Sequence, residues 1–129
     1  MPFLAKLSVE DQTSNVLFCS FRFTQVTDEI GKPSTVPRGG SITLTVESTG
    51  NVSLFDWMIS PTQMKSGTIT FYRRDAMSKL KELSFTDAHC VDYQETFNST
   101  GEFPMQIDIV LSAKKLSLNG SDFENKWSE

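Results

Sequence analysis

Most of this chain alternates apolar and polar residues with the period of two that is typical of a half-buried β-strand. The clearest run is residues 41–47, in which Ile42, Leu44 and Val46 alternate strictly with hydroxyl and acidic residues. Polar residues 11–15 are expected to form the first turn. Similar alternation predicts further strands at residues 3–9, 16–26, 68–73 and 79–97, and a last one through Met105, Ile107, Ile109, Leu111 and Ala113.

Residues 16–26 have one apolar face and one mixed face. The apolar face, which we expect to be buried, holds Leu17, Cys19, Phe21 and Phe23. The mixed face, which we expect to be partly solvated, holds Phe18, Ser20, Arg22 and Thr24. The strand is therefore predicted to border both the core and water.

The longest predicted strand, residues 79–97, changes phase in its middle. Leu83 and Phe85 share one face of a regular strand, whereas Cys90 would fall on the opposite face. A bulge or bend near residues 86–87 would reconcile the two halves.

One segment has the period of a helix instead. A helix is predicted over about residues 52–60, with Asn51 or Ser53 as its N-cap and Pro61 as its stop. A helix this short is marginal alone, so we expect it to lie against the strands at an open end of the barrel. The residues expected to pack on the barrel are Leu54, Phe55, Met58 and Ile59.

A long polar excursion separates two of the strands and reads DEIGKPSTVPRGG, with Ile30 and Val36 as its only clearly apolar residues. Compact domains usually join strands with two to five residues, so a connection of this length tends to be functional or disordered. We expect it to protrude and to be a contact surface. Its residues are Asp28, Glu29, Ile30, Gly31, Lys32, Pro33, Ser34, Thr35, Val36, Pro37, Arg38, Gly39 and Gly40.

Length and pattern together predict a single all-β domain over residues 1–129. Roughly seven or eight short strands with one helix are typical of a barrel or a sandwich. Residues 117–129 form a polar tail, and no second domain is predicted.

The net charge of −4, with acids and bases interspersed, argues against a nucleic-acid-binding protein. No apolar run approaches the roughly 20 residues of a membrane span, and the N-terminus does not resemble a signal peptide. We therefore expect a cytoplasmic protein without membrane insertion, in which Cys19 and Cys90 are reduced and buried.

Catalytic chemistry is not indicated. The only histidine, His89, adjoins Cys90, but neighbouring strand residues point to opposite faces, so the two cannot form a nucleophile pair. Two cysteines and one histidine do not match a structural zinc site. Gly39 and Gly40 precede a strand rather than a helix, so they do not form a phosphate-binding turn. We expect no metal, no cofactor and no enzyme activity.

Surfaces and sheet edges remain as functional elements. An open antiparallel barrel has edges that must be covered or paired, and a head-to-tail contact between identical copies closes into a ring if its rotation permits. The residues thus predict a self-assembling or binding β domain. The alternative is a monomeric barrel that binds a small ligand in a pocket lined by some of its ten phenylalanines.

Three blocks carry a resemblance to a known family. They are GKPSTVPRGG at residues 31–40 with ITLTVES at 42–48, LFDWMISP at 54–61, and the block from FYRRDAMSKL at 71–80 to CVDY at 90–93. These blocks resemble the haemolysin-coregulated protein family, the tube subunits of type VI secretion systems. The resemblance extends over residues 3–127 in order and with matching spacing.

The resemblance implies a two-sheet antiparallel β-barrel that assembles into hexameric rings, which stack into a hollow tube. It implies that the sheath, the spike and effector proteins are partners, that effectors travel in the lumen, and that the protein is secreted after assembly in the cytoplasm. Residues 28–40 would then contact the adjoining ring, and the chain would be a structural subunit.

Overall fold

The computed structural model describes residues 4–74 and 78–127. Phe3, at the start of the first predicted strand, lies outside the described residues. So do residues 75–77 of the segment 75–78, for which the sequence predicts a turn or a single helical turn. The elements are β1 (Leu4–Val9), β2 (Gln12–Phe21), β3 (Ser41–Glu47), α1 (Ser53–Ile59), β4 (Lys65–Tyr72), β5 (Lys79–Phe97), β6 (Met105–Leu118) and β7 (Ser121–Glu124).

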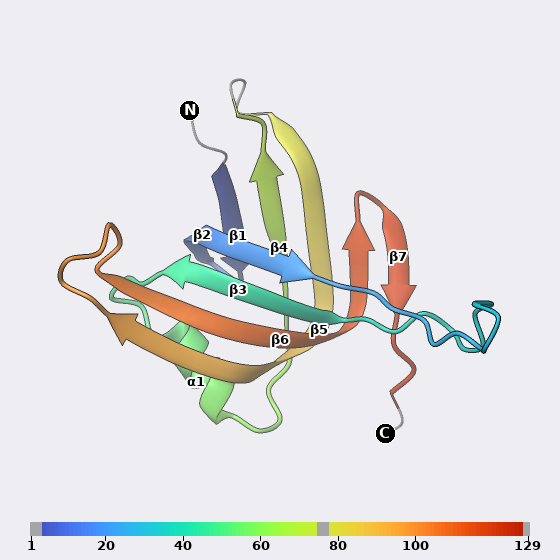
Figure 1. Ribbon diagram of the computed structural model, residues 1–129. Helices are drawn as coiled ribbons and strands as arrows, with labels where there is room; N and C mark the ends of the chain where they lie inside the picture. Colours follow the sequence, from blue (N-terminus) through green and yellow to red (C-terminus); the bar gives the residue numbers. More distant parts are fainter. Residues whose placement is uncertain (1–3, 75–77, 128–129) are drawn as a thin grey trace.

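The strands form one antiparallel sheet that closes on itself (Figure 1). Its order is β3-β2-β1-β4-β5-β6-β7, and pairing of β3 with β6 closes a six-stranded barrel. β7 lies outside the closed barrel, paired with the last residues of β6. The predicted antiparallel β-barrel with one short helix is confirmed.

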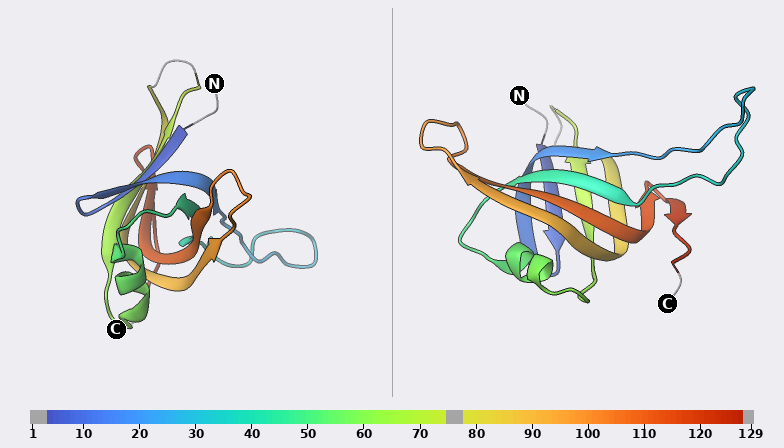
Figure 2. Two further views of the ribbon diagram at one scale, coloured as in Figure 1. Left: turned by 90° about the vertical axis from the view of Figure 1, so that its left-hand side faces the viewer. Right: turned by 60° about the horizontal axis from the view of Figure 1, so that its bottom comes forward.

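The barrel wall consists of two layers, because its strands change partners along their lengths (Figure 2). β2 pairs with β1 up to Asn15 and with β3 from Val16 onward. β5 pairs with β4 up to Ala88 and with β6 from Leu83 to its end at Phe97. One layer therefore holds β1, β4 and the first half of β5, and the other holds β2, β3, β6 and the second half of β5.

The bend that joins the layers lies in β5 where the sequence predicts it. Phe85 and Ala88 are both buried, which strict alternation forbids. Asp87 between them adopts a left-handed conformation with φ 52°, and its backbone N–H donates to Ser66 Oγ at 3.1 Å. The predicted change of phase is confirmed.

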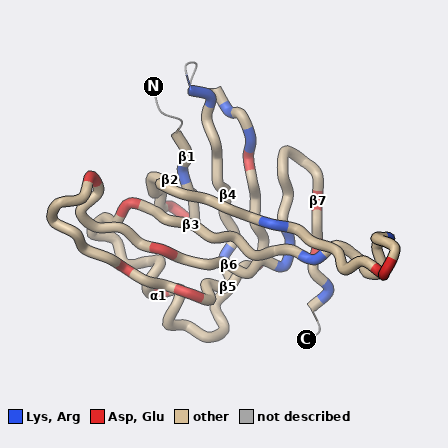
Figure 3. The backbone as a smooth tube through the Cα atoms, in the orientation of Figure 1, with Lys and Arg blue, Asp and Glu red and all other residues tan. Residues whose placement is uncertain are grey.

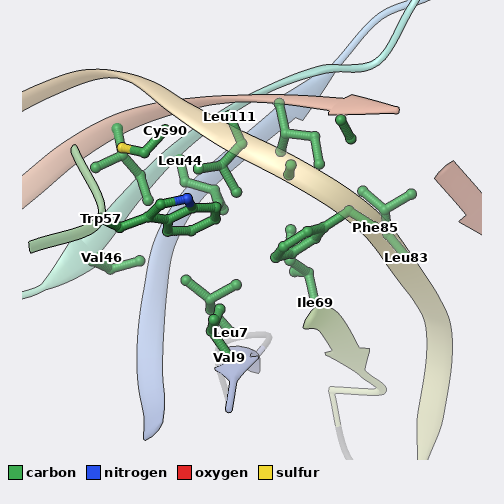
Figure 4. Close-up of a cluster of buried hydrophobic side chains, with 14 of the residues drawn as sticks. Leu7, Val9, Leu44, Val46, Trp57, Ile69, Leu83, Phe85, Cys90 and Leu111 are labelled. Carbon is green, nitrogen blue, oxygen red and sulfur yellow. The ribbon is translucent and has the colours of Figure 1, made fainter. Parts of the chain in front are cut away.

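The core lies between the layers and is apolar (Figure 4). Ile42, Leu44 and Val46 of β3 are fully buried, as their alternation predicts. Trp57 of α1 covers one side of this core and stacks on Phe85, with ring centroids 6.3 Å apart. Its indole N–H donates to the Gln63 carbonyl at 3.2 Å, so the one polar atom of the ring is satisfied.

The packing face of α1 differs from the predicted one. Leu54 and Met58 pack against the core, but Phe55 is 45% exposed and Ile59 is 61% exposed, whereas Trp57 is fully buried. The prediction omitted Trp57 because periodicity alone does not show which side of a short helix meets the barrel. Phe55 instead packs edge-on against Tyr93 of β5, with ring centroids 5.6 Å apart.

The start of α1 also departs from the prediction. Val52 occupies the N-cap position without a side-chain hydrogen bond, so neither predicted cap is correct. Asn51 Oδ1 still accepts a hydrogen bond from the Ser53 backbone N–H at 2.8 Å, one residue before the cap.

Two strand boundaries correct the sequence analysis near the N-terminus. The predicted turn at residues 11–15 is wrong, because Glu10 makes a tight turn with φ 56° and pairing resumes at Gln12. The predicted strand 16–26 ends at Phe21. A bulge at Leu17 places Val16, rather than Leu17, against the core with Cys19 and Phe21.

The predicted polar tail contains a strand that alternation did not reveal. Asn119 and Gly120 have φ values of 48° and 93°, so they form the hairpin turn between β6 and β7. An Asn-Gly pair is the strongest short sequence signal for such a hairpin and could have located β7.

Candidate functional site

The predicted protrusion stands away from the barrel as an extended arm between β2 and β3 (Figures 1 and 2). We call residues 22–40 the arm. Its residues 22–38 are exposed, and only Gly39 and Gly40 at its base are shielded. All thirteen predicted contact residues, 28–40, belong to the arm.

Backbone hydrogen bonds hold the two halves of the arm together. Thr24 and Arg38 exchange bonds of 2.9 and 2.7 Å between their backbone groups. Farther out, the Ser34 N–H donates to the Val26 carbonyl and the Asp28 N–H donates to the Lys32 carbonyl, both at 2.8 Å. The arm is therefore an ordered ribbon with its own hydrogen bonds, although it has no core.

The arm tip is a turn organised by Asp28. Its Oδ1 accepts hydrogen bonds from the backbone N–H groups of Ile30 and Lys32, each at 3.0 Å. Gly31 adopts φ 87°, a conformation that residues with side chains rarely adopt. As a result Ile30 points into solvent with 86% of its surface exposed, and Val36 is 75% exposed. Both apolar side chains are therefore accessible to another protein chain.

The second candidate surface is the pair of free edges of the layer formed by β2, β3, β6 and the second half of β5. One edge is β2 beyond Asn15, where β1 no longer pairs with it. The other is β5 beyond Ala88, where β4 no longer pairs with it. Exposed apolar side chains mark both edges, with Phe18 on β2, and Val91 and Phe97 on β5. Unpaired edges of this kind are templates for pairing with another chain.

An apolar groove of about 460 Å³ borders the β2 edge. It opens where β2 diverges from β1, and its lining comes from β1, β2, β4 and the start of β5. The side chains that line it include Leu4, Phe18, Phe71 and Leu80, and Lys81 adds a positive charge to the lining.

Charge is distributed unevenly over the barrel (Figure 3). β5 begins with Lys79 and Lys81 and ends with Asp92 and Glu95. The Glu95 carboxylate accepts hydrogen bonds from two hydroxyl groups, Ser48 Oγ and Tyr93 Oη. Burial, followed by this hydrogen bond to Glu95, raises the pKa of Tyr93 to about 12. The β5 edge is thus acidic, whereas the groove beside the β2 edge has Lys81 in its lining.

Residues with possible catalytic chemistry are placed apart. His89 packs its ring against Trp127, with centroids 5.7 Å apart. Cys19 and Cys90 are free thiols, and burial raises the pKa of each to about 11. Cys90 is buried as predicted, whereas Cys19 is only half-buried. Within residues 4–74 and 78–127, no group of three or more His, Cys, Asp or Glu side chains could hold a metal ion. In the same residues, α1 is too short to cross a bilayer.

Comparison with known proteins gave a consistent result. The family model described as Hemolysin coregulated protein Hcp (TssD) matches residues 1–128. The structure of Hcp1 from Flavobacterium johnsoniae is similar, with 43% identity, a TM-score of 0.90, and coverage of 95% of this chain and 99% of that one. A search of curated proteins gave no match.

More distant structures share the fold. Hcp1 from Salmonella typhimurium is 13% identical, with a TM-score of 0.75, covering 95% of this chain and 92% of its own. A chain of the sheath–tube complex of the extracellular contractile injection system PVC is 21% identical, with a TM-score of 0.56 and coverage of 90% and 88%.

Proposed function

Because this chain belongs to the haemolysin-coregulated protein (TssD) family, it is a subunit of the type VI secretion tube, and we propose how its surfaces build that tube. Members of this family are structural proteins rather than enzymes. We propose that six copies close into a ring and that rings stack into a hollow tube. The observation that carries the proposal is the family match over residues 1–128, together with 43% identity to a solved Hcp1.

Ring closure would use the two free sheet edges. Along the layer β2-β3-β6-β5 each strand runs antiparallel to its neighbour. The end strands β2 and β5 therefore run in opposite directions, so β5 of one copy meets β2 of the next in antiparallel orientation. A contact between two different edges is head-to-tail, and such contacts form closed rings when their rotation permits.

The groove beside β2 supports the same contact. The neighbouring β5 edge would bring Val91 and Phe97 toward the apolar groove, and Asp92 and Glu95 toward the lysine in its lining. Covering exposed apolar side chains contributes roughly 25 cal/mol per Å² of apolar surface. Opposite charges at this contact favour the correct pairing over alternatives.

Stacking would use the arm. Residues 28–40 reach beyond the barrel and present Ile30 and Val36 without a core of their own. Pro33 and Pro37 restrict the backbone, which lowers the entropy lost when the arm docks on the next ring. We propose that these thirteen residues are the ring-stacking contact.

The lumen would be lined by the outer face of the same four-stranded layer. This face carries short polar side chains in register, with Ser20 opposite Thr43 and Thr45 opposite Asp108. A polar face suits a water-filled channel that carries effector proteins. We propose that the subunit is made in the cytoplasm, assembles inside a sheath on a spike, and is secreted through the apparatus.

Light scattering on a size-exclusion column, with electron microscopy of the peak, tests ring formation. We expect a hexameric ring without added ligand. A monomer at every concentration, stabilised by a small apolar ligand in the groove, would instead favour the alternative of a ligand-binding barrel.

Replacing residues 28–40 with a tight Asn-Gly turn tests the role of the arm. We expect rings of normal size, no stacks, and no secretion of the variant. Secretion at the normal level would contradict the assignment of stacking to these residues.

A further inference from the structure

The root of the arm is held by the C-terminal hairpin. On one half of the arm, the ring of Phe23 packs edge-on against Phe123 of β7, with centroids 4.8 Å apart and planes at 77°. On the other half, the Gly39 carbonyl accepts a hydrogen bond from the side chain of Asn125. Both halves of the arm therefore rest on the segment that follows the Asn119–Gly120 turn.

Asn125 links this segment to both the arm and the barrel. Its Nδ2 donates to the carbonyls of Gly39 and Ala113, each at 3.0 Å, and its backbone N–H donates to the Lys114 carbonyl at 2.7 Å. The Gly40 carbonyl in turn accepts from the Ala113 N–H at 2.8 Å. A side-chain amide has two N–H donors, and here both are used. We call these contacts among Gly39, Gly40, Ala113 and Asn125 the root clamp.

Both glycines at the root are required by close contacts, Gly40 by this approach and Gly39 by the Phe23 ring. A Cβ atom at Gly40 would lie 2.4 Å from Asn125 Nδ2 and 2.7 Å from the Ala113 carbonyl oxygen, and Gly40 has φ 101°. A Cβ atom at Gly39 would lie 2.2 Å from the Phe23 ring. A side chain at Gly40 would push the arm away from the hairpin, and one at Gly39 would displace the Phe23 ring that packs on Phe123. The root clamp thus explains Gly40, and the packing of Phe23 explains Gly39, two glycines that the strand pattern left without a role.

We propose that Asn125 is a positioning residue that fixes the direction of the arm, so that the C-terminal hairpin controls ring stacking without forming the ring contact. This inference rests on the proposed role of the arm in stacking. An extended chain advances roughly 3.3 Å per residue, so the tip of the arm lies on the order of 20 Å from its root. A rotation of the arm by about 20° at the root would therefore move the tip by about 7 Å. A displacement of that size separates the tip from a surface formed to receive it.

Two substitutions at one position test the clamp. Asn125→Asp removes both donors and places a carboxylate beside two carbonyl oxygens, whereas Asn125→Ala removes the donors without adding charge. The matched control is Asn98→Asp in the turn between β5 and β6. There Oδ1 of Asn98 only accepts, from the N–H and Oγ1 of Thr100 at 3.1 and 2.9 Å, and a carboxylate accepts equally well.

Light scattering measures the mass of the rings, and electron microscopy counts the stacked rings. Amide hydrogen exchange measures how well the backbone hydrogen bonds at the root of the arm are protected. We expect both Asn125 variants to form rings but to lose at least tenfold in the number of stacked rings. The Ala113 amide should exchange at least tenfold faster, because its acceptor, Gly40, is released. The amides of Thr24 and Arg38, which bond to each other within the arm, should keep their rates. Asn98→Asp should match the unaltered protein in every measurement.

Three outcomes would overturn the inference. Undiminished stacking of the Asn125 variants would show that the clamp does not matter for the arm. Loss of rings would place Asn125 in the ring contact. Lost stacking with an unchanged Ala113 rate would mean that Asn125 touches the next ring directly. If the unaltered protein forms rings but no stacks, the stacking proposal fails, whereas the exchange rates still decide whether Asn125 holds the root.

Discussion

In the barrel, Ile42 and Leu44 are fully buried, whereas in the arm Ile30 and Val36 are almost fully exposed. Both segments are ordered by antiparallel hydrogen bonds, but only the barrel adds a core to them. Burial of apolar surface supplies most of the free energy of folding, so the barrel carries the stability of the subunit. The arm contributes little to folding, and its apolar side chains remain available to another copy.

The largest effect is expected where the barrel is most tightly packed. Trp57→Ala removes a fully buried ring that stacks on Phe85, and should lower the free energy of unfolding by about 3–5 kcal/mol. Thermal and urea unfolding measure this loss. Phe55→Ala, on the same helix but half exposed, is the matched control and should cost about 1 kcal/mol. Equal losses at the two positions would contradict the observed orientation of α1.

The next largest effect should change the stacking of rings without changing the stability of the subunit. The double substitution of Ile30→Asp with Val36→Asp places charges on the docking face of the arm, so we expect stacks to disappear while the unfolding free energy changes by less than about 0.5 kcal/mol. Ile30→Val with Val36→Ile keeps the face apolar and serves as the control. A large loss of stability in the charged variant would show that the arm packs on its own barrel.

Thiol reactivity gives a chemical comparison of the same two regions. Burial raises the pKa of Cys19 and Cys90 from 9.0 to about 11, whereas a thiol introduced by Ser34→Cys lies on the exposed arm. At pH 8 the thiolate fraction of each native cysteine should be roughly a hundredfold lower than that of the arm thiol. Alkylation followed by mass spectrometry measures the three rates. Equal rates would mean that the core admits the reagent.

The same pKa values predict how stability depends on pH. In the unfolded chain the thiols ionise near 9, while in the barrel they keep their protons up to about 11. The contribution of the protonated thiols to the free energy of unfolding is therefore complete below pH 9 and is lost as pH rises from 9 toward 11. Urea unfolding across this range should show the decline, and Cys90→Ala should make it shallower. A stability that rises with pH in this window would contradict the burial of the thiols.

The smallest effect is expected from the prolines of the arm. Pro33→Ala with Pro37→Ala increases the freedom of the undocked arm, which should weaken stacking by roughly 0.4–1 kcal/mol per position and leave rings unchanged. The concentration at which stacks appear should rise several-fold, measured by sedimentation. Unchanged or stronger stacking would show that the prolines do not preorganise the arm.

Sequence patterns located the strands that have one buried and one solvent-exposed face, because such strands alternate apolar and polar residues. β3 and the full extent of β5, including its bend at Asp87, were predicted in this way. The patterns failed where a neighbour decides the outcome. Which side of α1 is buried depends on the barrel, and β7 is short and mostly polar, so its pairing with β6 left no alternation to read.

The candidate surfaces divide in the same way. Glycine, proline and polarity marked residues 28–40 as a protrusion, and the structure places them in an exposed arm. The sequence did not indicate Asn125, because a lone asparagine in a polar tail resembles any surface residue. Its two acceptors, the Gly39 and Ala113 carbonyls, are 86 and 12 residues away along the chain.

The sequence by itself determined that this chain is an all-β barrel or sandwich with one short helix and a polar excursion, since local alternation and turn residues record burial and backbone freedom residue by residue. Only the tertiary structure decided which strand edges remain free, which side of the helix is buried, and what holds the root of the arm. Those features depend on contacts between residues far apart in the chain. Such contacts leave no periodic trace, because each one is set by the closure of the barrel as a whole.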